Sequence, residues 1–158
     1  MRAVVRRPAV VAATALVVSA FAVGILARRS GRGPVDLPAE AAPATSAKAP
    51  CERFERRLPD RLGSLERRDT RPERPGFAAY GDPAVVVRCG VPASARYRSG
   101  DQLIAINDVA WYADESRPGG VDFSLPRSIV NISVWIPAAH RAELLSLLTD
   151  AVKDAQPL

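Results

Sequence analysis

Residues 129–136 have the sequence IVNISVWI, which is the clearest strand pattern in the chain. Every second residue from Val130 to Ile136 is a branched apolar residue, and the residues between them are Asn131, Ser133 and Trp135. Side chains on a strand point alternately to its two faces. The pattern therefore predicts a strand with one buried face and one mostly exposed face.

Further strand patterns precede this one at residues 84–89, 103–106, 109–113 and 121–125. The segments 103–106 and 109–113 flank Asn107-Asp108, a pair that tolerates positive φ, so they predict a tight hairpin. The segment 66–76 is strongly charged and is expected to form a loop.

Two helical patterns enclose the strands. Apolar residues at steps of three and four from Cys51 predict a short helix over 51–58, which Pro59 ends. A second apolar stripe predicts a helix over 138–154, with Pro137 in its first turn. Because the connections are short, we expect an α+β domain: an antiparallel meandering sheet of four to five strands with both helices on one face.

The N-terminal part of the chain has a membrane pattern. Residues 1–7 form a basic flank, residues 8–27 contain no charge, and Arg28 and Arg29 follow directly. Twenty apolar residues in a helix span the hydrocarbon core of a bilayer, so we expect a single transmembrane signal anchor. The alternative is a signal peptide cleaved after Ala20-Phe21-Ala22, which would leave the protein secreted. Residues 28–50 are rich in Ala and Pro and are expected to form a linker before a domain at 51–158.

The net charge of +5 belongs to the N-terminal third of the chain. Residues 1–50 contain six arginines and Lys48 against Asp36 and Glu40, whereas residues 51–158 contain 15 basic and 15 acidic residues. The expected domain is therefore neutral overall, and no nucleic-acid partner is expected.

The only two cysteines are Cys51, at the start of the first expected helix, and Cys89, at the end of the first expected strand. A disulfide between them would place the domain on the oxidising, extracytoplasmic side of the membrane and the N-terminus in the cytoplasm. The alternative is two reduced cysteines buried as small apolar residues.

Residues that carry chemistry are scarce. His140 is the only histidine and no serine lies in a nucleophile elbow, so we expect no catalytic, cofactor-binding or metal-binding residues. Acidic side chains near the hairpin ends are the one alternative, as paired carboxylates; they are Asp108, Asp114, Glu115 and Asp122. The candidate contact surface comprises Trp135, which is either exposed or covered by another element, and the arginines Arg53, Arg57 and Arg61.

A family resemblance is carried mainly by residues 81–92, GDPAVVVRCGVP. Together with Cys51 and with Leu58-Pro59, this segment resembles the actinobacterial family catalogued as domain of unknown function 3515, as do the segments 109–111 and 134–137. Tyr80 stands where that family pattern leads us to expect tryptophan. The resemblance implies a membrane-anchored or secreted protein with a cysteine pair, and it implies no activity.

The leading hypothesis is a single-pass membrane protein with an extracytoplasmic, non-enzymatic module. This module would bind an envelope protein or polymer, while the N-terminal helix holds it to the membrane. The alternative is an envelope hydrolase that uses carboxylates to cleave glycan.

Overall fold

The computed structural model describes residues 33–38 and 44–156, and Pro34–Leu158 form one compact unit. The strands of its main sheet are β2 (Arg61–Leu62), β3 (Leu65–Arg68), β5 (Phe77–Tyr80), β6 (Val85–Cys89), β7 (Ile104–Ile106), β8 (Val109–Asp114), β9 (Gly120–Ser124) and β10 (Ile132–Pro137). The remaining elements are β1 (Val35–Asp36), β4 (Thr70–Arg71), α2 (Lys48–Arg57), α3 (Thr149–Ala155) and the 3₁₀ helices η1 (Thr45–Ala47) and η2 (Ala142–Leu148).

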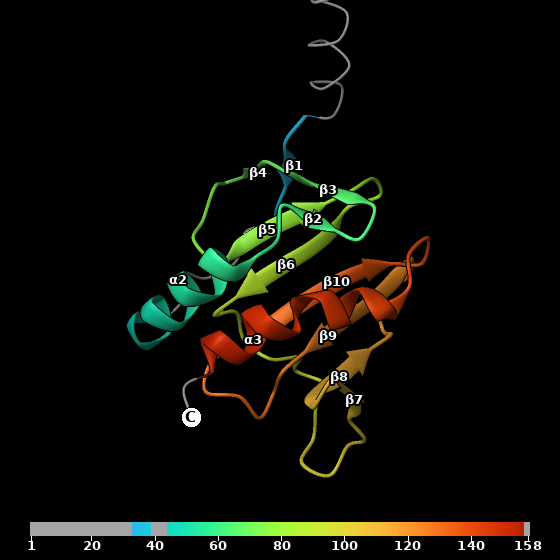
Figure 1. The fold of residues 1–158 in the computed structure, drawn as a ribbon. Coiled ribbons are helices and arrows are strands. Elements are labelled where there is room, and N and C mark those ends of the chain that lie inside the picture. Colours follow the sequence, from blue (N-terminus) through green and yellow to red (C-terminus); the bar gives the residue numbers. More distant parts are fainter. Residues whose placement is uncertain (1–32, 39–43, 157–158) are drawn as a thin grey trace, which may run out of the picture. The chain divides into compact units, whose positions relative to one another are not determined.

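Within the described residues, eight strands form one sheet in the order β2-β3-β5-β6-β10-β9-β8-β7 (Figure 1). Neighbouring strands in this sheet pair antiparallel. The short strands β1 and β4 form a separate parallel pair. The long strands β6, β10, β9 and β8 provide the central surface on which side chains from distant parts of the sequence meet.

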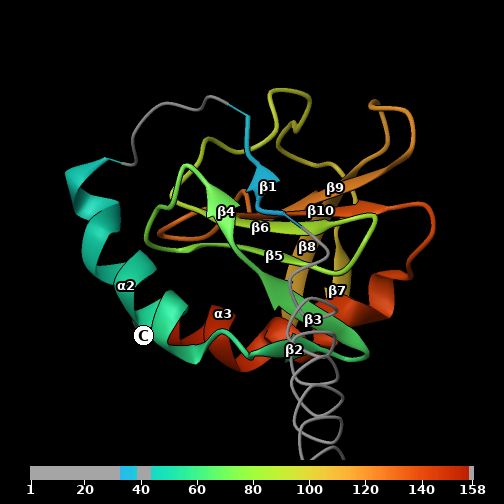
Figure 2. The same cartoon turned by 90° about the horizontal axis from the view of Figure 1, so that it is seen from above.

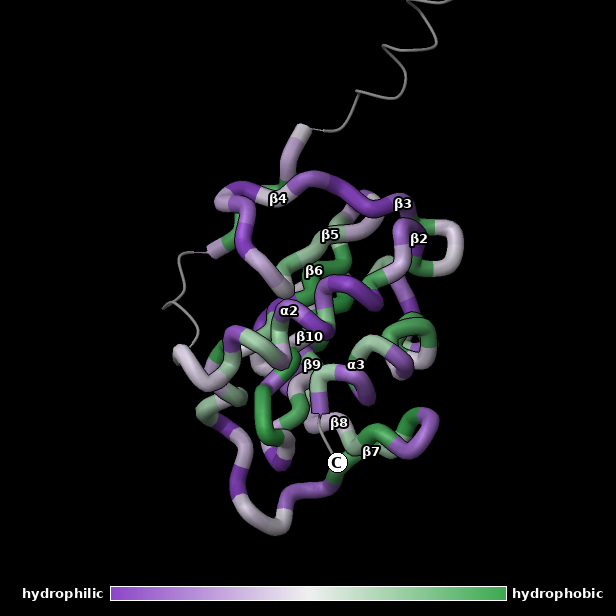
Figure 3. Tube along the Cα trace, turned by 60° about the vertical axis from the view of Figure 1, so that its left-hand side comes forward, coloured by the Kyte–Doolittle hydropathy of each residue, from purple (hydrophilic) through white to green (hydrophobic). Residues whose placement is uncertain are grey.

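The helices α2 and α3 lie on the same face of the sheet (Figure 2). Phe54 of α2 and Leu148 of η2 are buried in one core with Val87, Val134 and Trp111 of the sheet. Burial of these apolar side chains supplies the main favourable free energy of folding. The residues of β5 and β6 are mainly hydrophobic, whereas those of β3, nearer the sheet edge, are mainly hydrophilic (Figure 3).

The α+β class and the placement of both helices on one face are confirmed, but the expected number of strands was too small. The charged segment 66–76, expected to be a loop, contributes to β3 and contains β4. Its charges are tolerated because they have partners; the Arg68 guanidinium, for example, donates to the Gly81 carbonyl at 2.9 Å. A strand without alternating apolar residues leaves no periodic signal.

The strand expected over 129–136 is shifted to Ile132–Pro137, and all six of its residues are buried. The prediction of a mostly exposed second face was therefore wrong. Neighbouring side chains bury Ser133 and Trp135 on that face: Arg88 and Asp122 contact Ser133, and Arg117 lies over Trp135.

The helices also differ in their bounds. The first begins at Lys48 rather than Cys51, with Pro50 tolerated in its first turn, and ends at Arg57 just before Leu58-Pro59. The single helix expected over 138–154 is instead η2 followed by α3. The Ser146 hydroxyl donates to the Glu143 carbonyl at 2.7 Å, a local bond of the kind that competes with regular helix.

The segment expected to be a linker is partly folded. Val35 and Leu37 donate backbone hydrogen bonds to Asp69 and Arg71, each at 2.8 Å, and Leu37 packs with Phe77. The compact unit therefore begins at Pro34 instead of Cys51. The expected span at 8–27 lies outside the described residues, and no helix among those that are described is long and apolar enough to cross a membrane.

Candidate functional site

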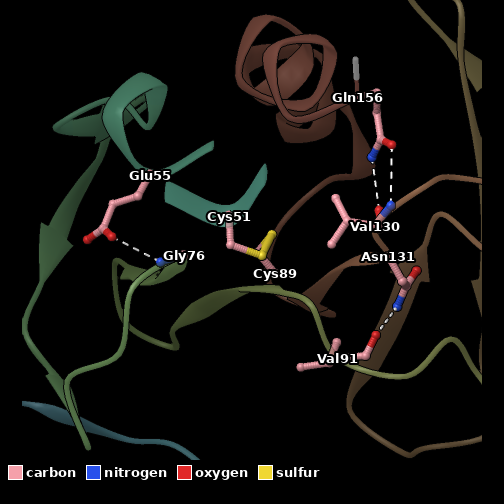
Figure 4. Close-up of a disulfide and its surroundings, with 8 residues drawn as sticks. All are labelled: Cys51, Glu55, Gly76, Cys89, Val91, Val130, Asn131 and Gln156. Atoms are coloured by element: carbon pink, nitrogen blue, oxygen red, sulfur yellow. Dashed lines mark hydrogen bonds between the residues drawn. A yellow bond between two sulfur atoms is a disulfide. The ribbon is translucent and has the colours of Figure 1, made fainter. Parts of the chain in front are cut away.

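Cys51 and Cys89 form a disulfide that joins α2 to β6, as expected, with their Cα atoms 5.6 Å apart (Figure 4). Gly76 lies against the bond, and a Cβ at this position would approach the Cβ atoms of Cys89 and Cys51 to 2.9 and 3.0 Å. The Gly76 amide donates to the Glu55 carboxylate at 3.1 Å (Figure 4). The disulfide thus fixes the first helix to the centre of the sheet.

The three arginines of the expected contact surface are engaged within the chain. Arg57 pairs with Asp154 at 2.5 Å, and Arg53 donates to the Asp154 carbonyl at 3.1 Å. Arg61 pairs with Glu66 across β2 and β3 at 2.7 Å. These exposed pairs connect neighbouring elements, and pairs of this kind each contribute little to stability.

Trp135 lies on the face of the sheet opposite the helices and is only 8% exposed. The sequence left open whether it is exposed or covered, and the structure covers it. The Arg117 guanidinium lies 3.5 Å from the centroid of its ring. A Cβ at Gly120 would approach the same ring to 2.7 Å, so the glycine lets the backbone of β9 pack directly against it. The structure does not bring Trp135 together with the three arginines.

Polar and aromatic side chains gather around Trp135 on this face. They alternate along β6, β10, β9 and β8 with the core residues of the helix-covered face, and cross-strand pairing brings them side by side. We call this set the polar platform; its residues are Arg88, Tyr112, Asp114, Asp122, Ser124, Ser133 and Trp135.

An ion pair lies at the centre of the polar platform. Arg88 Nη2 is 2.5 Å from Asp122 Oδ2 and also donates to Ser133 Oγ at 2.5 Å. The Ser133 hydroxyl in turn donates to Asp122 Oδ1. The side chains of Arg88 and Asp122 are 11% and 28% exposed, so both charges are largely removed from water.

Loops that follow β6 and β8 enclose one margin of the platform. The Ser94 hydroxyl donates to Asp114 at 2.6 Å, and the Ser116 amide donates to the same carboxylate at 2.9 Å. Burial alone would raise the pKa of Asp114, but hydrogen bonds from Ser116 and Ser94 outweigh it and lower the pKa. Asp114 is therefore an ionised acceptor at neutral pH.

Aromatic contacts complete that margin. The rings of Tyr97 and Tyr112 meet edge to face with centroids 5.3 Å apart. The Tyr97 hydroxyl accepts a hydrogen bond from Arg127 at 2.8 Å. Aromatic rings beside charged and hydroxyl groups offer both stacking surface and hydrogen-bonding groups to a polar ligand.

Of the four acidic residues considered as catalytic carboxylates, Asp114 and Asp122 are direct cross-strand partners on the platform. Asp108 lies elsewhere, in the hairpin turn, where it approaches Lys153 at 3.9 Å. His140 Nε2 is 2.8 Å from the Pro83 carbonyl. Among the residues that the structure describes, no group of three or more His, Cys, Asp or Glu side chains is arranged to hold a metal ion.

Two hollows lie apart from the platform. One of about 150 Å³ is lined by three arginines (67, 68 and 74) and by Glu55, Asp69 and Glu73, so its charges balance. The other, of about 560 Å³, is an open groove lined mainly by η2 and by Leu65. Neither contains a residue of the candidate contact surface.

Sequence reasoning missed Arg88, Ser133 and Ser124 as members of one site. Arg88 was only part of a strand segment, and Asp122 was only one of several acidic residues near turns. The sequence does contain a signal for the platform, because charged or hydroxyl residues occur in each of the central strands on the face opposite the core. That signal could be recognised only once the register of β6, β10 and β9 was known.

The structure defines a disulfide-linked α+β domain with an antiparallel sheet that is covered by helices on one face and carries the polar platform on the other. Residues 9–158 match the sequence model of a family described as protein of unknown function (DUF3515), and the chain belongs to this family. No curated protein and no solved structure matches the chain.

Proposed function

We propose that this chain is a membrane-tethered, non-enzymatic binding module whose polar platform contacts a component of the cell envelope, either a polymer or another membrane protein. The observation that carries the proposal is the Arg88–Asp122–Ser133 cluster beside Trp135 on the central strands. Ligand sites combine apolar surface with a few fixed polar groups, which is the composition of this face.

Energetics support a functional reason for the cluster. Removing two charges from water carries a desolvation penalty that their attraction does not always offset, and apolar residues of similar size often give equal or greater stability. A largely buried Arg–Asp pair in the middle of a sheet is therefore weak support for a purely structural role. Recognition of a polar ligand accounts for charges at this position.

The location outside the cytoplasm is part of the same proposal. The uncharged segment 8–27 supports an anchor, and the disulfide supports an oxidising compartment. Since the compact unit begins at Pro34, part of the expected linker over 28–50 belongs to the domain itself.

Hydrolysis of glycan by paired carboxylates is the second candidate, and the cross-strand pairing of Asp114 with Asp122 favours it. A general acid must carry a proton near neutral pH. The lowered pKa of Asp114 favours a carboxylate without a proton, and both oxygens of Asp122 are already engaged by Arg88 and Ser133. This environment suits binding better than acid catalysis.

The location is tested by labelling intact cells with a membrane-impermeant maleimide. Ile129 is 72% exposed, so the variant Ile129→Cys in the full chain provides a reactive thiol beside the two bonded cysteines. We expect labelling without permeabilisation. Labelling that appears only after the membrane is opened would place the domain in the cytoplasm and refute this part of the proposal.

Binding is tested by sedimenting isolated envelope polymer with the purified full chain in detergent. Arg117→Ala removes the side chain over Trp135, whereas Lys153→Ala removes a cation from α3, outside the platform. We expect the first variant to change polymer binding several-fold and the second to leave it unaltered. Equal polymer binding by both variants would contradict a polymer as the ligand of the platform, and cleavage of the polymer would favour the hydrolase.

A further inference from the structure

Strand β7 forms one edge of the eight-stranded sheet, so one side of it has no neighbouring strand among the described residues (Figure 1). Its residues are Ile104, Ala105 and Ile106, and the surrounding segment 102–107 has the uncharged sequence QLIAIN. Natural edge strands are commonly protected by charges, prolines or bulges. This edge has no charge and no proline.

The hairpin turn determines which backbone groups are free. Asn107 and Asp108 have φ values of 47° and 66°, and they join β7 to β8 by a two-residue turn in which Ile106 pairs with Val109 and Ile104 with Trp111. In an antiparallel pair, hydrogen-bonded and non-hydrogen-bonded positions alternate. The backbone groups of Ile104 and Ile106 therefore face β8, and those of Ala105 point away from it.

Apolar side chains accompany this free edge. Ile104 is 46% exposed and lies opposite Trp111, on the face of the sheet that carries the core. Ile106 is partly buried and packs against that core. A further strand placed beside β7 would cover the exposed side of Ile104 and extend the core.

We propose that the strand placed there is β7 of a second copy of this chain, paired antiparallel about a two-fold axis at Ala105. A symmetric pair of this kind requires a self-complementary surface. In this register, Ile104 of each copy lies opposite Ile106 of the other. Because the sequence Ile-Ala-Ile is the same in both directions, the two edges present identical side chains to each other. The outward N–H and C=O groups of Ala105 then bond to those of the second Ala105.

Charge balance favours a like partner over a charged one. Residues 34–158 contain 16 basic and 17 acidic residues, so two copies of the compact unit repel each other only weakly. The shared strand is short, and the contact therefore belongs to the small, weak class of interfaces. This pairing is independent of the ligand proposed for the platform, because β7 contributes no platform residue.

The test is chemical crosslinking of the full chain, in native membranes and in detergent, with a short bis-maleimide reagent. Because Cys51 and Cys89 are bonded to each other, Ala105→Cys supplies the single free thiol. Ile129→Cys is the matched control, since its position is exposed and lies outside β7. We expect covalent dimers from the first variant, and only background from the second.

A second variant separates edge pairing from random collision. Ile104→Lys in the Ala105→Cys background places two charges in the proposed contact and is expected to lower the dimer yield about tenfold. An intact Cys51–Cys89 bond in both proteins, checked by mass spectrometry without reductant, shows that they have folded. Dimer yield no higher than that of Ile129→Cys, yield unaffected by Ile104→Lys, or crosslinks to another protein instead would overturn the proposal.

Discussion

Tyr80 shows how one side chain connects the sheet to the chain segment that follows α2. It is buried in the core, and its hydroxyl donates to the Pro59 carbonyl at 2.9 Å. Burial raises its pKa from 10.0 to about 12, because the charged phenolate is poorly solvated there. The tyrosine that departs from the family resemblance thus has a specific polar contact.

This pKa predicts a loss of stability at alkaline pH. Below pH 10 the phenol is neutral in both states, whereas between pH 10 and about 12 it ionises in the unfolded chain but not in the folded one. The unfolded state then binds fewer protons, so the free energy of unfolding falls as the pH rises. Urea titrations across this range should show the fall, and Tyr80→Phe should make it shallower.

Tyr97→Phe is the matched control, because Tyr97 lies in a loop and its replacement leaves Tyr80 in place. An equally steep fall in Tyr80→Phe and in the native protein would contradict the assignment. At neutral pH, Tyr80→Phe should also cost about 1 kcal/mol, since the Pro59 carbonyl loses its donor.

Gly120 is required by a close approach. A Cβ there would be 2.3 Å from the Ile136 carbonyl oxygen and 2.7 Å from the Trp135 ring. We expect Gly120→Ala to lower the free energy of unfolding by about 1–3 kcal/mol and to shift the tryptophan emission, measured by urea denaturation and fluorescence. Gly33→Ala, whose Cβ would meet no atom within 4 Å, should leave both unchanged. Equal free energies of unfolding for the two variants would contradict this prediction, because they would mean that β9 can move away from β10 at no cost.

At the level of elements, the disulfide between α2 and β6 closes a long stretch of chain. Its cysteines are 38 residues apart, so the entropy of the unfolded state is reduced by an amount that corresponds to about 4 kcal/mol on the chain-entropy model. The same bond positions the start of the first helix over the central strands. On the other face, Arg88 of β6, Asp122 of β9 and Ser133 of β10 connect three strands through their side chains.

The Arg88–Asp122 pair predicts strong coupling between β6 and β9. Asp122→Asn leaves a largely buried guanidinium without its counter-charge and should cost about 2–3 kcal/mol. Arg88→Met should also lower the free energy of unfolding, because it leaves the Asp122 carboxylate without its counter-charge. The double variant Arg88→Met/Asp122→Asn should regain much of this stability. Urea denaturation of the four proteins measures the coupling free energy. Additive losses would mean that the two charges are independently solvated.

The elements with periodic apolar patterns could be predicted from the sequence. Segments whose structure depends on tertiary contacts could not. The central strands, the tight hairpin and the first helix have apolar periodicity, and the disulfide was expected from the two cysteines. Strand β3 has three charged residues out of four, so local pattern could not reveal it. The docking of Leu37 against Phe77 depends on residues far apart in the sequence.

The candidate site was harder to predict for a related reason. Trp135 was identified as a residue of interest, but its cover by Arg117 depends on how the loop before β9 folds over the sheet. The polar platform exists only in the register of four strands, and one residue of slip would move its side chains to the other face. The sequence therefore singled out three of its members, Asp114, Asp122 and Trp135, without indicating that they share one face.

For the whole molecule, the central claim is that the polar platform is the face that meets a partner outside the cytoplasm. The most direct measurement is site-specific photocrosslinking in intact cells, with a photoreactive side chain at Arg117, over the platform, or at Lys153, on the helix-covered side. We predict one discrete adduct, with a protein or an envelope polymer, from position 117 and none from position 153. The same adducts from both positions, or an adduct from position 153 alone, would contradict the account.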